Sequence, residues 1–495
     1  MALKLRTLSL LFLLLVGLGG WIGTSARPSY AETEEILAKT LYVSLEGSDS
    51  TGDGSWSAPY RTISKAASKA KAGDVVAVRG GVYTAVKQTI TATGTAAQPI
   101  VIRPHGGETV ILDGTGASIS TTDSIINIMS AKHLVFEGFE IRNSTGRGLS
   151  TYESEYITVR NNRIHETYKR GMGGSGNYLI FEGNEVWRAV LENENAAVGE
   201  GNGGWAAAVS TNVWWSTKAP SSYITFRNNH IHDSWGEGLI PLHAENVLIE
   251  GNRIHDTFSI NLYLDNTRNT RVLGNYLYST TSTYNRPSRG IPANGISLAN
   301  EGYDYPAVPL NNITIANNVV AGTGYGIGFW YDDSNASFEN SYRNLTIGYN
   351  VIYNTHREAL NFDAVPSNKQ QPENVLLQNN ILYEGQNGRS LNVNNPSGWQ
   401  FQHNNWPNGV PAEAQVGQSF AADPYFVSPV IGGPMNGFQL QSNSTSIGAG
   451  AVLLTVLLDY QGRFRLAPPS VGIHEPNGLL PSEFGNQLYL PFIGR

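Results

Sequence analysis

Two consecutive segments of this chain, residues 221–243 and 244–266, repeat the same order of residue types. Each begins with a β-branched and aromatic run, continues through an Asn and an Ile-His-Asp, and ends with a second short apolar run. The register extends through a series of anchor asparagines, preceded by Phe139 one repeat earlier: Asn162, Asn184, Asn229, Asn252, Asn275, Asn318, Asn350 and Asn380. Because most intervals lie between 22 and 32 residues, the chain is predicted to be a solenoid. Two intervals near 45 residues hold either a long insertion or an additional coil.

Each repeat contains short stretches in which apolar residues alternate, such as residues 247–249 and 262–264, and none has helical periodicity. A single coil cannot bury its own inward face, so stacking of coils must supply the core. The fold class expected is therefore all-β, a right-handed parallel β-helix solenoid, with a capping helix over residues 62–71. The 54 glycines and the frequent asparagines suit turns in every coil.

Composition excludes some partners and indicates a location. A net charge of −7, with only 15% charged residues, gives no basic surface for nucleic acid. Residues 1–31 have a basic start, an apolar run over residues 8–22 and small residues at Ser29 and Ala31, as a secretory signal peptide does. The mature protein is expected to be secreted or held in the cell envelope, without a transmembrane span. The chain has no cysteine, and its oligomeric state stays open.

Residues 41–145 carry motifs that resemble a known family. They read YVS-x-x-GSDS, W-x-A-P-Y-x-T-I, A-GD-V-V-x-V-RGG-x-Y and G-T-A-A-Q-P-I-x-I-x-P. This order resembles the N-terminal cap and first coils of secreted pectate-lyase-like β-helix proteins, including family nine pectate lyases. We therefore expect a signal peptide (1–31), a cap with the first coils (32–114), repeats that carry a groove (115–396), a closing segment over the other end (397–476) and a tail (477–495).

A row of rings lies three residues after the anchor asparagines: His165, Trp187, His232, His255, Tyr278, Tyr353 and Tyr383. Because aromatic residues continue the row, a ladder of stacked rings is the preferred interpretation. Histidines one coil apart, at a strand spacing of ~4.8 Å, would also suit a metal such as zinc, and this alternative stays open.

The second short strand of each coil is predicted to carry the functional face. Its inward residues align as Leu239, Leu262, Ile296, Ile327, Leu360 and Leu391, so the residues that follow them point outward. Insertions at residues 189–222, 280–293, 301–310, 334–341 and 366–372 are expected beside this strand and should form a groove.

Carboxylates, amides and aromatic rings gather on this face, as a sugar polymer requires. The predicted catalytic residues are Asp265, Glu301 and Asp332. The predicted substrate-binding residues are Glu237, His243, Tyr263, Arg289, Trp330, Asn361, Asp363 and Trp205.

The preferred function is hydrolysis of glycosidic bonds in a polysaccharide by two carboxylates, with no cofactor. The pair on adjacent coils is Asp265 and Glu301, while Asp265 with Asp332 or Asp333 is a more widely spaced pair. The resemblance implies an alternative, calcium-dependent elimination, with Asp332, Asp333 and Asp363 as candidate calcium ligands. The lysine of that family is missing here, and Arg289, Arg357 or Arg389 would replace it. A third alternative is a non-catalytic glycan-binding protein of the cell envelope.

Overall fold

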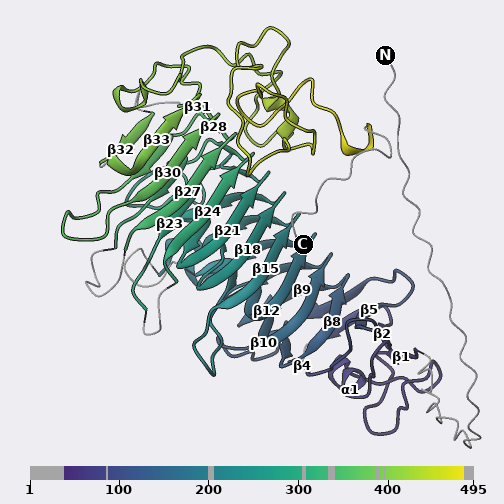
Figure 1. The fold of residues 1–495 in the computed structure, drawn as a ribbon. Coiled ribbons are helices and arrows are strands. Elements are labelled where there is room, and N and C mark those ends of the chain that lie inside the picture. The colour runs from purple at the N-terminus through teal and green to yellow at the C-terminus, as the bar shows by residue number, and fades with distance from the viewer. Residues whose placement is uncertain are drawn as a thin grey trace, which may run out of the picture. The chain divides into compact units, whose positions relative to one another are not determined.

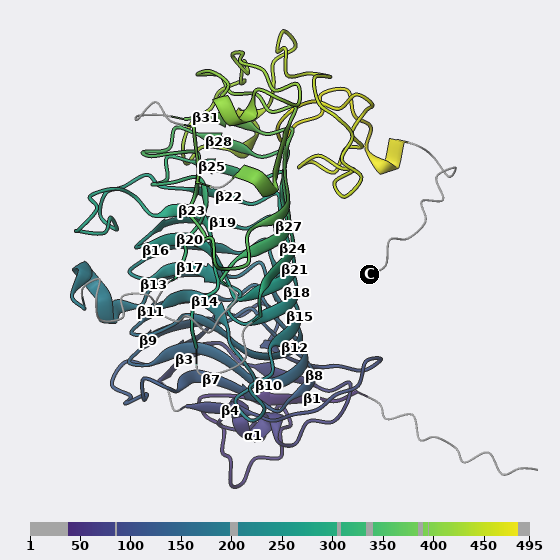
Figure 2. The ribbon, with the colours of Figure 1, turned by 60° about the vertical axis from the view of Figure 1, so that its left-hand side comes forward.

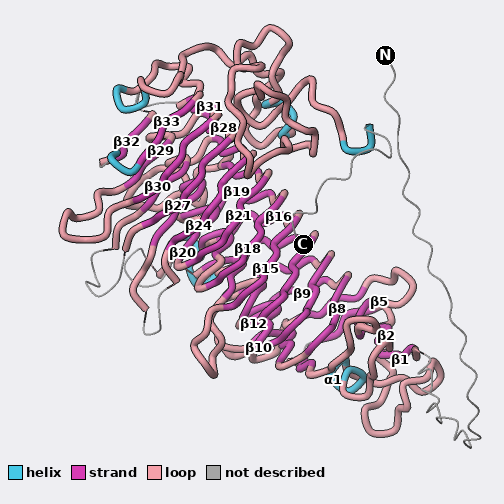
Figure 3. The backbone as a smooth tube through the Cα atoms, in the orientation of Figure 1, coloured by secondary structure: helices cyan, strands magenta, loops and turns pink. Residues whose placement is uncertain are grey.

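The computed structural model describes residues 38–84, 87–198, 206–303, 308–332, 340–384, 390–394 and 396–483. These residues belong to one compact unit that begins at Ala38. In this unit short strands stack in parallel rungs, from β4 near one end to β31 near the other (Figures 1 and 2). Strands dominate, and helical turns are confined to short segments (Figure 3). The predicted signal peptide lies outside the described residues, as does the end of the predicted tail.

Each complete coil contributes strands to three faces, which we call the groove face, the second face and the third face. The groove face consists of β4 (Gln88–Ile90), β7 (Ser124–Met129), β10 (Arg147–Arg160), β12 (Met172–Glu182), β14 (Ala207–Thr211), β17 (Glu237–Ile240), β20 (Ile260–Asp265), β23 (Asn294–Ala299), β26 (Ile327–Phe329), β29 (Leu360–Phe362) and β32 (Leu391–Val393). The long strands β10 and β12 turn the corner and pair on the second face too.

The second face contains, besides the far ends of β10 and β12, the strands β1 (Thr40–Val43), β2 (Val75–Val78), β5 (Ile100–Pro104), β8 (Lys132–Glu137), β15 (Ser221–Arg227), β18 (Ala244–Glu250), β21 (Thr267–Leu273), β24 (Leu310–Ala316), β27 (Tyr342–Gly348), β30 (Glu373–Gln378) and β33 (Trp399–Gln402). The third face is a separate sheet of β3 (Gly81–Thr84), β6 (Val110–Asp113), β9 (Glu140–Ser144), β11 (Arg163–Thr167), β13 (Glu185–Ala189), β16 (His230–Ser234), β19 (Arg253–Thr257), β22 (Tyr276–Tyr278), β25 (Val319–Ala321), β28 (Val351–Tyr353) and β31 (Ile381–Tyr383). Every pairing between these strands is parallel, so the unit is a parallel β-helix.

The anchor asparagines form a buried hydrogen-bonded ladder inside the coils. Asn252 is typical: its Oδ1 accepts from the backbone N–H and the side-chain Nδ2 of Asn229, at 2.9 and 3.0 Å. Its own Nδ2 donates to Asn275 Oδ1 at 2.9 Å and to the carbonyl of Phe226 at 2.9 Å. The same pattern continues to Asn404. These amides satisfy buried backbone groups at the turn, so the anchor position requires asparagine.

The groove-face strands pair in the register that the sequence predicted. Leu239 pairs with Leu262, and the series continues through Ile296, Ile327, Leu360 and Leu391 as aligned from the sequence. Both long intervals are insertions, because β13 pairs directly with β16 and β22 pairs directly with β25. The segment 189–222 is not one insertion, since it contains β14, a strand of the groove face.

The two ends of the solenoid differ from the expectations. The helix α1 covers only Ile63–Ala67, shorter than predicted, with Ile63, Ala66 and Ala67 buried. The C-terminal region contains the 3₁₀ turns η2 (Pro396–Gly398), η3 (Ala412–Ala414) and η4 (Met435–Phe438). Part of it packs along the third face rather than over the end, because Phe438 and Ile473 share an apolar cluster with Val319 and Val351.

The insertions rise on both edges of the groove face, not beside one edge only. Residues 190–206, with η1 (Leu191–Ala196), and residues 279–293 precede groove strands β14 and β23. Residues 300–309, 330–341 and 363–372 follow β23, β26 and β29. No helix in the described part of the chain is long and apolar enough to cross a membrane.

Candidate active site

A pocket of about 900 Å³ lies on the groove face. Its walls come from β14, β17, β20, β23 and β26 and from the loops that follow or precede them. Eight residues named from the sequence line it together: Glu237, Tyr263, Asp265, Arg289, Glu301, Trp330, Asn361 and Asp363. Parallel stacking explains this, because strands of equal register present their outward side chains along one line.

Asp265 and Glu301 form the centre of the pocket. The Tyr303 hydroxyl donates to Asp265 Oδ2 at 2.5 Å and also lies 3.4 Å from Glu301 Oε2. The backbone N–H of Glu301 approaches Asp265 Oδ1 at 3.3 Å, and Asn266 Nδ2 donates to the same oxygen at 2.8 Å. The Tyr263 hydroxyl donates to Glu301 Oε1. Two carboxyl groups are thus held by two phenols in one network.

Burial shapes the acidity of this pair. Asp265 is only 1% exposed, and burial together with the neighbouring Glu301 charge raises its pKa to about 7. Burial also raises the pKa of Glu301, while the hydrogen bond from Tyr263 opposes this rise. Glu301 is the more exposed of the two. Asp265 therefore keeps its proton to a higher pH than an ordinary aspartate does, beside a second carboxyl group with more access to the pocket.

Glu237 adds a third carboxyl group to the same wall. Its side chain is 3% exposed, and burial, followed by repulsion from Glu301 and Asp265, raises its pKa well above the usual range. Arg286 lies close enough to oppose this rise. Burial and the neighbouring carboxylates therefore favour the protonated form of Glu237, which can donate as well as accept a hydrogen bond.

One end of the pocket combines an aromatic ring with amides. Trp330 is 47% exposed on the rim, following β26, and Asn361 accepts from Asn392 Nδ2 at 2.7 Å. The Asp363 carboxylate accepts the backbone N–H of Tyr331 at 3.3 Å, and burial raises its pKa. An exposed ring beside amides offers stacking area and hydrogen bonds to a sugar.

The other end of the pocket is cationic. Arg170 donates to Ser210 Oγ at 3.1 Å and to Ser150 Oγ at 3.3 Å, while Arg147 donates to the Thr122 carbonyl at 3.1 Å. Burial, then repulsion from Arg147, lowers the pKa of Arg170 to about 9. No carboxylate of the described residues lies within ion-pair distance of either guanidinium. Lys169, in contrast, is paired with Glu192.

Some predicted residues lie elsewhere. His243 does not line the pocket: it is 1% exposed, its ring packs edge-on against Tyr303 at 4.7 Å, and burial lowers its pKa to about 4. Asp332 is 8% exposed, also outside the lining, and accepts the backbone N–H of Gly302 at 3.2 Å. Both residues follow the last residue of a groove strand by three positions, and the Asp332 charge is close enough to raise the pKa of Glu301. Trp205, Asp333 and Arg389 lie outside the described residues.

The sequence reasoning missed Tyr303, Arg286 and the cationic end. Tyr303 and Arg286 belong to insertions, which have no repeat to align. A weak signal for Tyr303 existed, since it follows the predicted Glu301 by two residues. Arg147 and Arg170 begin or precede groove strands of earlier coils, and their own register would have placed them on this face.

Of the calcium ligands that the resemblance implies, Asp332 and Asp363 belong to the described residues and Asp333 does not. Calcium takes six to eight oxygen ligands. Asp332 and Asp363 instead accept backbone N–H groups, and Asp332 lies outside the pocket. Among the described residues, one group of three side chains lies close enough together to share a metal ion, and its members are histidines on the third face.

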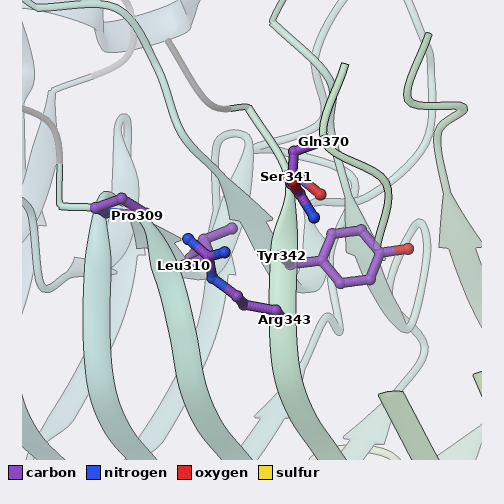
Figure 4. A pocket seen from close by; sticks show the side chains of 6 residues that line it. All are labelled: Pro309, Leu310, Ser341, Tyr342, Arg343 and Gln370. Atoms are coloured by element: carbon purple, nitrogen blue, oxygen red, sulfur yellow. The ribbon is translucent and has the colours of Figure 1, made fainter. Parts of the chain in front are cut away.

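A second, small crevice lies between the second-face strands β24 and β27 (Figure 4). Its lining residues are Pro309, Leu310, Ser341, Tyr342, Arg343 and Gln370. It has no room for a water molecule, and Tyr342 is only 2% exposed. The crevice is a packing gap beside a buried ring and not a candidate site.

Comparison with known proteins agrees with this architecture. A family model for the Pel9A-like right-handed β-helix region matches residues 41–209, and one for a right-handed β-helix region matches residues 215–342. Pectate lyase PEL9 of Emericella nidulans is 33% identical over 182 residues, which cover 34% of this chain and 42% of that protein. The uncharacterised protein YwoF of Bacillus subtilis is 27% identical over 140 residues, covering 26% of this chain and 30% of that protein. The chain thus spans less than half the length of these curated relatives.

Two solved structures share the fold at low sequence identity. The crystal structure of pectate lyase Pel9A has a TM-score of 0.55 and 15% identity, covering 89% of this chain and 96% of that one. The complex of XylC with xylose has a TM-score of 0.54 and 13% identity, covering 78% and 87%. At these identities the likeness concerns the fold alone.

Proposed function

We propose that this chain, which is a pectate-lyase-like right-handed parallel β-helix protein, is a carbohydrate-active enzyme that hydrolyses glycosidic bonds of a polysaccharide in its groove. The observation that carries this proposal is the sharing of one phenol hydroxyl by Asp265 and Glu301. Their oxygens lie at most about 6 Å apart, because that hydroxyl is 2.5 Å from one and 3.4 Å from the other. This spacing suits a retaining mechanism, since an inverting pair needs ~6.5–9.5 Å.

Asp265 is the acid in this proposal and Glu301 the nucleophile. Its raised pKa lets Asp265 keep a proton near neutral pH, and this proton passes to the leaving glycosidic oxygen. Glu301 is the more exposed of the two and accepts a hydrogen bond from the Tyr263 hydroxyl. As a carboxylate it attacks the anomeric carbon. In the second step Asp265 accepts a proton from water, whose oxygen bonds to the anomeric carbon as the bond from that carbon to Glu301 breaks. Asp332, outside the groove lining, takes no part.

The remaining groups bind and orient the polymer. Trp330 stacks against a sugar face, and Glu237 and Asn361 form hydrogen bonds with hydroxyl groups that would otherwise lose their water. No cofactor enters these steps. We place the reaction outside the cytoplasm, because residues 1–31 have the pattern of a signal peptide.

The test measures products from neutral and uronic polysaccharides, with the chain purified from residue 32 onward. We expect new reducing ends without unsaturated sugars, unaffected by chelator, and an initial product that keeps the anomeric configuration of the substrate. Inverted product, or no cleavage of any polymer in the panel, would remove the assignment of Asp265 and Glu301 as a retaining pair.

Elimination is the second candidate, favoured by the cationic end of the pocket. Arg147 and Arg170 are not engaged by carboxylates of the described residues and would neutralise a uronate, as would Arg289. Unsaturated ends that vanish with chelator and return with calcium would establish calcium-dependent elimination instead. Binding of glycan without any cleavage would favour the envelope-binding alternative.

A further inference from the structure

Three histidines converge on the third face, away from the groove. His232 and His255 belong to the row of stacked rings, with ring centroids 5.1 Å apart, and the row continues to Trp187 at 6.0 Å and Tyr278 at 4.4 Å. Stacking therefore accounts for those two residues, as the sequence indicated. His230 belongs to a different row, which contains Arg163, Glu185, Arg253 and Tyr276, and its ring reaches across to stack on His232 at 4.1 Å.

The ring nitrogens of the three histidines lie close enough to share an ion. His230 Nε2 is 2.9 Å from His255 Nε2, and one ligand atom from each of the three residues falls within 4.8 Å of the others. A tetrahedral ion with bonds of about 2.0–2.1 Å separates its ligand nitrogens by roughly 3.3 Å. Small rotations of the imidazole rings would bring the nitrogens from their present separations to the separation that a bound ion requires.

Neighbouring carboxylates orient two of the rings for ligation. His232 Nδ1 lies 2.8 Å from Asp233 Oδ2, and His255 Nδ1 lies 2.7 Å from Asp256 Oδ2. When the carboxylate accepts a hydrogen bond from Nδ1–H, the Nε2 atom of the same ring carries the lone pair that a metal requires. His232 Nε2 is buried without a hydrogen-bond partner among the described residues, and Glu185 Oε1 stands 3.5 Å from it.

We propose that His230, His232 and His255 bind one divalent transition metal ion of the zinc class, with Glu185 or water as the fourth ligand. Imidazole nitrogens favour zinc, copper, nickel and iron over calcium or magnesium. Glu185 Oε1 also lies 3.8 Å from His230 Nδ1, while its Oε2 is held by Arg163 at 3.1 Å. The proposal is independent of the reaction in the groove.

A metal ion at this site would stabilise a loop of the groove and would not take part in catalysis. Asp256, which orients His255, also accepts the backbone N–H of Thr280 at 2.7 Å, its hydroxyl at 2.8 Å and the N–H of Thr281 at 3.1 Å. That segment leads directly to Arg286 and Arg289 in the pocket wall. An ion on His255 therefore stabilises the start of the loop that carries both arginines.

The experiment titrates the whole chain with Zn²⁺ alone after chelator treatment and desalting, by calorimetry and by equilibrium dialysis with elemental analysis. We expect one ion per chain. His230→Gln, at a position one row away from the ladder, and Asp233→Asn should each weaken binding about 10- to 100-fold. His165→Gln is the matched control, because His165 stacks on Trp187 in the same ladder but lies outside the trio. It should keep full affinity.

Absence of Zn²⁺ binding, or binding that His230→Gln and Asp233→Asn leave unchanged, would overturn the proposal. X-ray absorption of the loaded chain provides an independent readout, for which we expect three imidazole ligands. Fewer than two imidazoles would also contradict the site. A rise in the unfolding midpoint with Zn²⁺ that His165→Gln retains and His230→Gln loses would support it.

Discussion

Asp265 and Glu301, which stand 36 residues apart in the sequence, share the hydroxyl of Tyr303. Parallel pairing of β20 with β23 brings Asp265 beside Ala299, and the chain then turns so that Glu301 lies over the same pocket. The shared phenol makes the two carboxyl groups one acid–base unit, because a change at either one alters the hydrogen bonding of the other.

Asp265→Asn should leave the fold intact and reduce kcat about 10³-fold, because the amide keeps the shape but cannot deliver a proton. Substrates with a good leaving group need less protonation, so their kcat should fall much less. The measurement is the rate on polymer and on an activated aryl glycoside. Glu245→Gln serves as control, since Glu245 pairs with Arg268 on the second face and should retain full activity.

The contribution of Asp265 to the free energy of unfolding should fall as pH rises from about 4 to 7. The native pKa of Asp265 is about 7, above the ordinary aspartate value, so within this window the unfolded chain has lost a proton that the native chain keeps. Fewer protons bound in the unfolded state give the free energy of unfolding a negative slope with pH. Burial raises the pKa of Glu237 and Glu301 as well, which adds to the same slope.

Asp265→Asn removes part of this slope, because asparagine does not ionise. Denaturant titrations of both proteins between pH 4 and 8 check this. Parallel stability curves for the two proteins would contradict a raised native pKa at Asp265.

Tyr303→Phe should shift both limbs of the pH–rate profile to higher pH. The hydrogen bond from Tyr303 lowers the pKa of Asp265 and of Glu301, so its loss raises both. Tyr263→Phe is the matched variant, because the Tyr263 hydroxyl donates to Glu301 and should move only the acidic limb. Identical profiles for the two variants would show that the shared hydroxyl has no separate effect on Asp265.

Trp330→Ala should raise KM for the polymer about tenfold while kcat changes little, since stacking on a sugar acts in binding. Trp215→Ala provides the comparison: Trp215 is 80% exposed but lies outside the pocket lining. The measurement is KM and kcat of both variants by steady-state kinetics. An equal effect of the two substitutions would exclude a specific sugar platform at Trp330.

Asn252→Ala should lower the free energy of unfolding by about 3 kcal/mol or more, because it leaves buried donors and acceptors on both neighbouring coils unsatisfied. Asn311→Ala is the control. Asn311 accepts from Asn344 Nδ2 at 2.8 Å in an exposed ladder, so water can replace its partner and the cost should stay below about 1 kcal/mol. Denaturant unfolding of both variants measures the difference.

The periodicity of the sequence predicted much of this architecture. An apolar residue at every second position of short strands fixed the alignment of Leu239, Leu262 and Ile296, which pair as expected. From that alignment alone Asp265, Tyr263 and Asn361 were placed on one outward face, and all three line the pocket. The residues at strand ends, His243 and Asp332, were misplaced, because alternation stops where the chain turns the corner.

What the sequence determined by itself is the repeating coil, since a period and an alternation are local properties that survive without knowledge of any contact. What only the tertiary structure decided is which groups from non-repeating segments meet. Tyr303 and Arg286 come from insertions, and His230 gains its meaning from a ring nitrogen one coil away. Acidity follows the same division: the pKa of a carboxyl group depends on the burial and the charges around it, which exist only once the coils are stacked.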